Sequence, residues 1–408
     1  MSAAPPAGTH YDSAYSWTRL AISVLIATIG NVGMWSVVVV LPAVQAEFGA
    51  GRGEASLPYT TTMVGFAVGN LLIGRYVDRY GMALPLSIAG AANGVGFVLA
   101  GVSGSLWLFA LAQGLLIGIG TAANFGPLLA DISHWFQRRR GLAVAAAASG
   151  NYLAGAVWPP LMQPFLDGYG WRTTYVGIGL FILVTVVPLA LFLRRPRPES
   201  ESAGAGAAML KPMSLSPRAL QALLILAGLG CCVAMSMPQV HIVAYCADLG
   251  YGAARGAEML ALMLAGGIVS RLLSGYVADR IGGVPTLLIG SIAQGLSLLF
   301  YIPFDGLASL YAVSLLFGLS QGGIVPCYAI IVREYFPARE AGQRTGLIIM
   351  ATIVGMAFGG WVSGWIYDAT GSYHAAFLNG IAWNLLNVTT MLFVLFRTGR
   401  PKAGMAAA

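Results

Sequence analysis

Residues 256–280, GAEMLALMLAGGIVSRLLSGYVADR, are apolar over the length of a membrane span but carry one arginine, Arg271, in their interior. At a helical rise of about 1.5 Å per residue, Arg271 lies roughly 20 Å from Glu258 and roughly 12 Å from Asp279, too far to pair with either. A charge within hydrocarbon costs from about 3 to above 10 kcal/mol, so such residues usually mark a substrate or ion path. The stretch therefore predicts a membrane helix with a functional arginine.

Small residues share the helix face of this arginine. They are Gly266, Gly267, Ser270, Ser274 and Gly275. A stripe of this kind suits a helix that is packed closely or lines a cavity. The alternative is that Arg271 extends along the helix toward the cytoplasmic end, about eight residues away. The small stripe favours a ligand-binding role.

The composition places the chain in a membrane. Of 408 residues, 57% are apolar and 9% are charged, whereas a soluble domain has roughly 25% charged residues. The 54 glycines and 20 prolines predict tightly packed helices, several of them kinked. The four cysteines lie in hydrophobic segments without CxxC or metal-ligand spacing, so we expect no disulfide framework, metal site or cofactor.

Segments long enough to cross a bilayer need about 20 apolar residues, and the chain offers twelve. They are 18–41, 56–76, 83–102, 105–130, 140–164, 172–193, 217–246, 256–278, 284–303, 306–331, 341–366 and 374–396. With both termini inside, eighteen of the 22 Lys and Arg residues are cytoplasmic, and only Arg52, Arg172 and Arg255 lie outside. This asymmetry predicts a multi-pass protein of the inner cell membrane with cytoplasmic termini.

The chain divides at a Pro-, Ser- and Gly-rich linker, residues 194–216, between predicted bundles at 18–193 and 217–396. Cytoplasmic tails cover residues 1–17 and 397–408. The halves resemble one another, because GRYVDRYG at 74–81 recurs as GYVADRIG at 275–282. A parallel repeat predicts an all-α fold of two six-helix bundles, related by a pseudo-two-fold axis, with a site between them near the midplane.

The repeated G-x-x-x-D-R-x-G pattern resembles the signature of the major facilitator superfamily. It places a gating motif on Gly74, Asp78, Arg79, Gly275, Asp279 and Arg280. The glycines are expected to allow close helix approach, the aspartates to cap or pair at a neighbouring helix end, and the arginines to stay cytosolic.

Three shorter segments resemble one subfamily. WFQRRRGLAVAAAASG, residues 135–150, is similar to the signature that precedes the fifth span of monocarboxylate transporters. DSAYSW, residues 12–17, is similar to their D-G-G-W-G-W signature, with Ser13 and Ala14 in place of the glycines. GGIVSRLLSGYVADR resembles the eighth span of these transporters and of oxalate/formate antiporters, which implies that Arg271 is the substrate-binding arginine.

Departures from these families bear on the charge of the site. Gly267 stands where animal monocarboxylate transporters have an aspartate, Ala43 where they have a lysine, and Thr352 where oxalate transporters have a lysine. All fifteen acidic residues lie in loops or near span ends, Asp131 deepest. A planar guanidinium binds carboxylate through two parallel hydrogen bonds, so one fixed cation suits one carboxylate.

The rest of the predicted pocket comes from polar and aromatic residues at mid-span depth. They are Asn31, Trp35, Asn124, Phe125, Asn151, Tyr152 and Tyr328. The alternative for the aromatic residues is packing, and for the asparagines an interhelical hydrogen bond worth about 0.6–2 kcal/mol. His241 is the only histidine well inside a span and is a candidate proton carrier, with a packed, hydrogen-bonded histidine as the alternative.

The leading hypothesis is a secondary active transporter of a small monocarboxylate such as lactate or pyruvate, working by alternating access as a monomer. The resemblance implies proton symport, whereas the residues alone leave uniport or anion exchange open. An oxalate/formate-type exchanger is the alternative, although the second cation is absent. Drug efflux would more naturally use a membrane carboxylate. No nucleotide loop, metal cluster or soluble domain supports an enzyme, a sensor or nucleic-acid binding.

Overall fold

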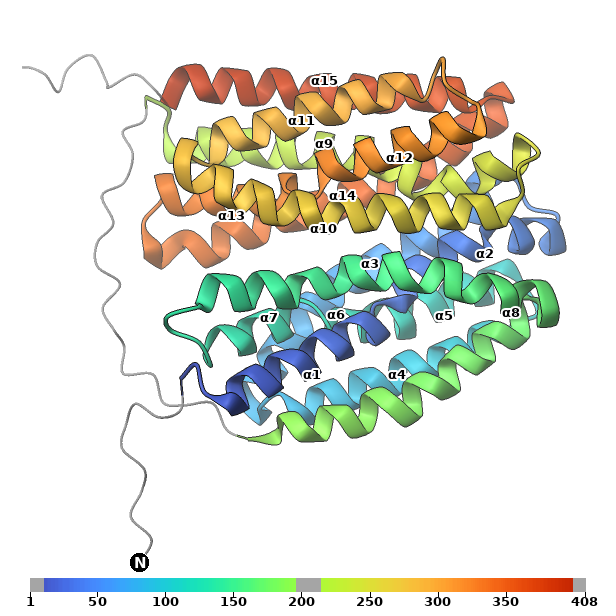
Figure 1. The fold of residues 1–408 in the computed structure, drawn as a ribbon, viewed down its shortest axis with the longest axis horizontal. Coiled ribbons are helices and arrows are strands. Elements are labelled where there is room, and N and C mark those ends of the chain that lie inside the picture. Colours follow the sequence, from blue (N-terminus) through green and yellow to red (C-terminus); the bar gives the residue numbers. More distant parts are fainter. Residues whose placement is uncertain (1–10, 196–213, 399–408) are drawn as a thin grey trace, which may run out of the picture. The chain divides into compact units, whose positions relative to one another are not determined.

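The computed structural model of the chain describes residues 11–195 and 214–398, without the side chains of Asp78, Arg140, Ala338 and Arg339. These ranges are helical and contain no strand (Figure 1). Most of the predicted linker and parts of both predicted tails lie outside the described residues.

Two compact units make up the chain, residues 1–40 with 61–203 and residues 41–60 with 204–408. The division differs from one at the linker alone, because residues 41–60 belong to the second unit. The helices up to the linker are α1 Ala14–Gly30, α2 Val32–Phe48, α3 Arg52–Tyr80, α4 Ala83–Gly101, α5 Leu106–Ala112, η1 Gln113–Gly118, α6 Ile119–Ala122, α7 Gly126–Ser133, α8 Arg140–Leu191 and η2 Phe192–Arg194. Those after it are α9 Pro217–Asp248, α10 Ala253–Ile281, α11 Gly283–Phe300, α12 Leu307–Gln321, α13 Ile324–Tyr335, α14 Ala338–Thr370 and α15 Tyr373–Thr398.

These helices account for the predicted spans. Ten helical segments of the described residues are long and apolar enough to cross a membrane. One of them, Gly141–Arg194, is kinked at Gly170, whose φ of 75° is open to glycine, and so provides two spans. The 29-residue α3 covers the remaining predicted span, 56–76, but it is less apolar and is not one of these ten segments. The prediction of an all-α membrane protein is confirmed.

Three of the spans are interrupted rather than continuous. The first breaks at Asn31, between α1 and α2, and the tenth at Gly322 and Gly323, between α12 and α13. The fourth contains the π-helix η1 and then a turn at residues 123–125 before α7. Breaks within membrane helices expose backbone groups that neighbouring side chains must satisfy, so they are where binding sites tend to form.

Each unit has its own close helix contacts. In the first unit, α4 packs on α8, where a Cβ on Gly94 would lie 2.8 Å from the Gly179 carbonyl oxygen. In the second unit, α9 packs against α10, α14 and α15 and is buried along most of its length. Its Cys231 and Leu224 join a hydrophobic core with residues of α11 and α13.

Candidate functional site

Arg271 lies partly buried on α10, beside the break between α12 and α13. Its Nε donates a hydrogen bond of 3.4 Å to the Gly322 carbonyl oxygen. One residue earlier, the Ser270 hydroxyl accepts a hydrogen bond of 3.3 Å from the Gly323 amide. Two consecutive residues of α10 therefore satisfy backbone groups that the interruption of the tenth span releases.

The small stripe of α10 packs closely against this interrupted span. A Cβ on Gly318 would lie 2.9 Å from the Met263 Cα atom, and one on Gly322 would lie 2.8 Å from the Gly267 Cα atom. A Cβ on Gly323 would overlap the Ser274 side chain. Close packing, one of the two expectations for the stripe, is thus what the structure shows, with glycine required on the interrupted span.

The predicted pocket residues lie in both units. Tyr328, in α13, is fully buried; its hydroxyl accepts from Asn387 Nδ2 at 3.1 Å and donates to Cys231 Sγ at 3.5 Å. In the first unit, Trp35 Nε1 donates to the Asn151 carbonyl oxygen at 3.1 Å. Phe125 packs against Phe66 with ring centroids 6.0 Å apart. Tyr152 is buried at 7% exposure.

Asn31 and Asn124 meet where two broken spans of the first unit come together. Asn31 Nδ2 donates to the Asn124 carbonyl oxygen at 3.4 Å. The role of the predicted pocket residues in substrate binding stays a prediction.

His241, in α9, is fully buried with a partner on each ring nitrogen. Nε2 lies 2.8 Å from the Gly360 carbonyl oxygen, so Nε2 carries the proton. Nδ1 lies 3.2 Å from the Tyr373 hydroxyl, which donates to it when the ring is neutral. The neutral imidazole is therefore hydrogen-bonded at both ring nitrogens, and within the described residues the side chain positioned to exchange a proton with it is the Tyr373 hydroxyl.

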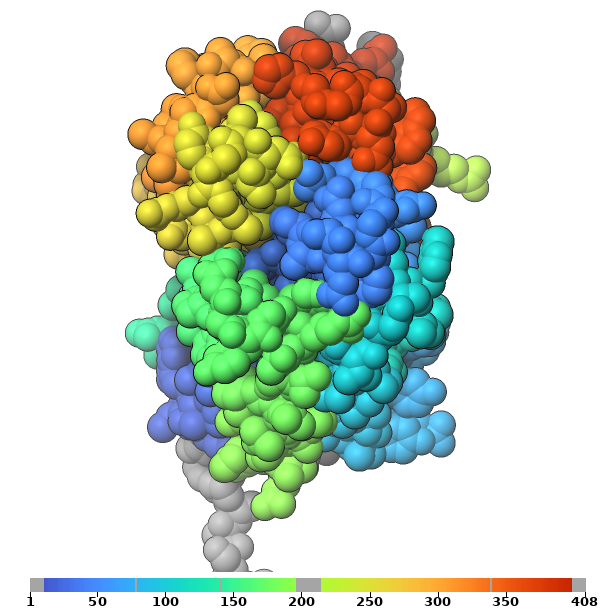
Figure 2. Space-filling view, turned by 90° about the vertical axis from the view of Figure 1, so that its right-hand side faces the viewer, coloured from blue at the N-terminus to red at the C-terminus, as the bar shows by residue number. Residues whose placement is uncertain are grey.

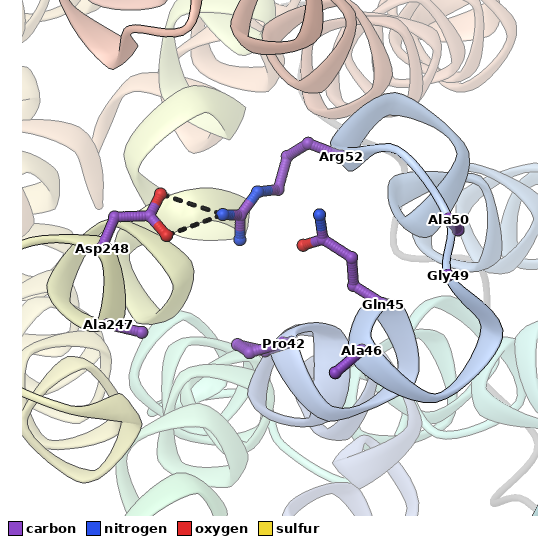
Figure 3. A pocket seen from close by; sticks show the side chains of 8 residues that line it. All are labelled: Pro42, Gln45, Ala46, Gly49, Ala50, Arg52, Ala247 and Asp248. Carbon is purple, nitrogen blue, oxygen red and sulfur yellow. Dashed lines mark hydrogen bonds and ion pairs between the residues drawn. The ribbon is translucent and has the colours of Figure 1, made fainter.

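Arg52, at the start of α3, is the centre of an ion cluster in the second unit. Its Nη2 contacts both Asp248 oxygens, at 2.8 and 2.9 Å (Figure 3). The Asp368 carboxylate accepts from the Arg52 and Gly53 amides at 2.7 and 2.8 Å, where an acid complements the helix dipole. The Arg52 guanidinium carbon lies 5.8 Å from the centroid of the Tyr373 ring.

This cluster ties residues 41–60 to the ends of α9 and α14, and Figure 2 shows residues 41–60 (blue) against the end of the red segment. It borders an open cavity of about 480 Å³, into which Gln45 and Arg52 extend in Figure 3. From the sequence, Arg52 was expected only as a charge on the outer side of the membrane. Its partners are 196 and 316 residues away, so no local signal identifies them.

Asp12 binds the backbone at the start of α8. Its carboxylate accepts from the Gln137, Arg138 and Arg139 amides at 3.0–3.3 Å, and Asp12 itself has a φ of 51°, which is uncommon outside glycine. Burial raises the pKa of the Asp12 carboxyl, but these three hydrogen bonds outweigh it and hold the pKa below its usual value. Two of the three segments that resemble monocarboxylate-transporter signatures, residues 12–17 and 135–150, therefore contact each other.

Aromatic side chains extend this contact. Tyr15 packs on Trp135 and Trp17 on Phe136, each pair with ring centroids 5.1 Å apart. Arg19 joins the two segments to α7, because its Nε donates to Asp131 Oδ2 at 2.8 Å and both side chains are 1% exposed. The acidic residue that the sequence ranked deepest is thus paired with a buried arginine.

The repeated gating motif shows less packing than expected. Among the described residues, nothing lies within 4 Å of a Cβ added to Gly74 or to Gly275. The expectation that these glycines are needed for close helix approach is therefore wrong in this conformation. Arg79 lies over the Tyr80 ring and Arg280 over the Tyr276 ring, at 5.3 and 4.4 Å.

Asp279 is exposed, and the Asp78 side chain lies outside the described residues. A gating role for the motif stays a prediction.

Comparison with known proteins decides the family. The sequence model of the Major Facilitator Superfamily matches residues 21–307 and 258–407. The chain belongs to the Major Facilitator Superfamily. Monocarboxylate transporter 13 of Bos taurus is 29% identical over 79% of this chain and 75% of its own length. Monocarboxylate transporter 11 of Mus musculus is 28% identical, over 74% and 69%.

The chain is also similar to a fungal transporter and to a solved bacterial transporter structure. The MFS-type transporter pynF of Aspergillus niger is 29% identical over 74% of this chain and 69% of its own. Among solved structures, a bacterial homologue of the human lysosomal transporter Spinster, inward-facing and occupied, superposes with a TM-score of 0.67. It is 14% identical, over 94% of this chain and 96% of its own, and shows the fold alone. The chain is accordingly a multi-pass membrane transporter, and its relatives imply a small-molecule substrate.

Proposed function

We propose that this protein is a secondary active transporter of a small monocarboxylate of the lactate or pyruvate type, with proton symport. It works by alternating access in the inner membrane, with both termini in the cytoplasm. The similarity to monocarboxylate transporters 11 and 13 over about three quarters of the chain supports this substrate class. The basic residues that flank the spans support the orientation.

Arg271 is the residue that we assign to the carboxylate. The observation that carries the assignment is the position of Arg271 on α10, directly beside the interrupted tenth span. The bond from Nε to the Gly322 carbonyl oxygen orients the guanidinium plane, and a planar guanidinium offers a carboxylate two parallel donors. Substrate binding neutralises this charge, which favours the closed form of the transporter.

Proton symport is assigned to His241, through the hydrogen bond between Nδ1 and the Tyr373 hydroxyl. An imidazole that exchanges a proton near physiological pH is the usual side chain for such a step.

The test is uptake by the purified protein in liposomes, with lactate, pyruvate, formate, oxalate and a lipophilic cation as substrates, with and without a pH gradient. We expect lactate or pyruvate uptake that an acidic exterior stimulates. Exchange of oxalate for formate would instead identify an anion exchanger, and transport of the lipophilic cation alone would identify an efflux protein.

Arg271→Lys tests the arginine itself. Lysine keeps the charge but loses the planar two-point donor, so substrate affinity should fall about 10- to 150-fold, the loss of a charge-assisted contact worth about 1.5–3 kcal/mol. Arg255→Lys is the matched control, since Arg255 lies on the same helix but is exposed. Wild-type affinity in Arg271→Ala would exclude the binding role, and unfolding of the substrate-free Arg271→Ala protein would indicate a structural arginine.

A further inference from the structure

Three buried asparagines in the first unit each leave a side-chain oxygen without a donor. Asn31, Asn93 and Asn124 are at most 1% exposed. The Oδ1 atom of each accepts no hydrogen bond from the described part of the chain. A buried acceptor without a donor costs about 1–3 kcal/mol, so three of them in one region require an explanation.

The orientation of the three carboxamides is fixed by their other end. Asn31 Nδ2 donates to the Ala27 carbonyl oxygen at 2.6 Å, Asn93 Nδ2 to that of Gly30 at 2.9 Å, and Asn124 Nδ2 to that of Gly120 at 3.3 Å. Carbonyl oxygens accept and never donate, so turning any of these groups over would place oxygen against oxygen.

The nearby Thr121 hydroxyl also bonds to the backbone, because it donates to the Gly30 carbonyl oxygen at 3.3 Å. These four side chains therefore donate their hydrogen bonds to backbone carbonyl oxygens, and the three Oδ1 atoms remain as acceptors without a donor.

The three asparagines lie at or beside one turn of the chain, residues 30–33, where the first span is interrupted. A Cβ on Gly30 would meet the Asn124 carboxamide, Nδ2 first and then Oδ1 at 2.6 Å, and one on Gly33 would lie 3.7 Å from Asn93 Oδ1. Asn31 lies between these two glycines in the chain and caps α1. This turn is thus bordered by asparagine carboxamides from the third and fourth spans.

Helix ends of both signs meet at the two breaks. The 17-residue α1 ends at Gly30 and α6 ends at Ala122, while α2 begins at Val32 and α7 at Gly126. The partial negative charge of each C-terminal end is therefore offset by the partial positive charge of the N-terminal end that follows it, so the attraction for a cation comes from the carboxamide oxygens. Within the described residues, the three carboxamides donate to backbone carbonyl oxygens and not to a charged side chain.

We propose that these asparagine oxygens bind a monovalent alkali cation inside the first unit, between the broken first and fourth spans. Neutral carbonyl-type oxygens replace the hydration shell of such an ion, as they do in selectivity filters. A divalent ion would call for carboxylate ligands, and a carboxylate substrate would meet only acceptors. The inference concerns a site other than Arg271 and stands whether or not the protein carries a monocarboxylate.

The first test is the thermal stability of the purified, substrate-free wild-type protein in detergent, in NaCl, KCl or choline chloride at one ionic strength. A single bound cation at ten times its Kd shifts the unfolding equilibrium about 11-fold, so Tm should rise saturably in Na⁺ or K⁺ but not in choline. Bound ²²Na⁺ should be displaced by unlabelled NaCl and not by choline chloride. Equal Tm values in the three salts, with no saturable ²²Na⁺ binding, would overturn the proposal and leave the oxygens to water.

Asn93→Asp tests whether the rise of Tm in Na⁺ or K⁺ comes from the asparagine cluster. The variant sets a carboxylate oxygen against the Gly30 carbonyl oxygen, so it should melt below wild type in choline and recover in Na⁺ or K⁺ by more than the wild type gains. Asn384→Asp is the matched control: Asn384 is equally buried, in the second unit, and also donates to a backbone carbonyl, that of Ser291. The Tm of Asn384→Asp should lie below that of the wild type by the same amount in all three salts.

The same loss of Tm in every salt for Asn93→Asp, or an equal Na⁺ recovery in Asn384→Asp, would contradict the assignment. If Asn93→Asp does not fold, the wild-type titration and ²²Na⁺ binding decide. Neither measurement involves monocarboxylate transport, so a failure here is distinct from a failure of the proposed substrate.

Discussion

Asp131→Asn should destabilise the first unit strongly, because it leaves a buried guanidinium without its carboxylate. Arg19 and Asp131 are each 1% exposed and are joined by an ion pair of 2.8 Å. Breaking a buried pair from one side costs about 3–5 kcal/mol, whereas an exposed pair is worth at most about 1 kcal/mol. For a unit of this size, the loss corresponds to a Tm lower by about 6–20 °C.

Arg19 has other contacts that do not depend on the Asp131 carboxylate. Its Nη1 donates to the Tyr15 hydroxyl and its Nη2 to the Leu193 carbonyl oxygen, each at 3.1 Å, and Trp135 lies 4.6 Å from its guanidinium carbon. These contacts hold the side chain in place when the carboxylate is neutralised. Asp131→Asn therefore exposes the cost of the unbalanced charge rather than a loss of packing.

The assay is thermal unfolding of the single and double variants in detergent, read as a double-mutant cycle. Replacing both residues by apolar ones, Arg19→Met with Asp131→Leu, should recover much of the stability, since the charge and its desolvation are removed together. A Tm for Asp131→Asn within about 2 °C of the wild type would refute the reasoning, as would a double variant as unstable as the sum of the single ones.

Two further predictions concern the second unit. Arg52→Lys should lower Tm, because an ammonium cannot keep both the two-oxygen contact with Asp248 and the contact with the Tyr373 ring. Arg255→Lys is the control and should leave Tm unchanged, because the ion pair of Arg255 is exposed. Equal effects of the two substitutions would contradict a special role for Arg52. His241→Gln should abolish the stimulation of uptake by an acidic exterior while counterflow persists, measured in proteoliposomes; unchanged stimulation would assign His241 to packing.

Spans were predictable from the sequence because they depend on local properties. Hydropathy over about 20 residues identified each of the twelve segments. The break at Gly322 and Gly323 and the kink at Gly170 sit on glycines, which is the residue that permits them. The resemblance of the two halves, through GRYVDRYG and GYVADRIG, also lies in the sequence alone.

Pairings between spans were not predictable in this way. Helical periodicity indicates which residues share a face, but the partner of that face depends on the rotation and depth of another helix. Arg19 was expected to flank the first span in the cytoplasm, yet it is 1% exposed and pairs with Asp131, 112 residues further on. Gly74 and Gly275 were expected to be close contacts and have open space in the described structure.

The sequence by itself determined that this protein is a membrane-spanning helical transporter with one arginine inside its eighth span, because length, hydropathy and a repeated motif are properties of contiguous residues. Only the tertiary structure decided what the polar residues contact. Asn31, Asn93 and Asn124 come from three different spans, and each alone suggests no more than an interhelical hydrogen bond. Their shared lack of donors depends on which residues of neighbouring helices lie beside each carboxamide oxygen, and that is set by packing rather than by any local pattern.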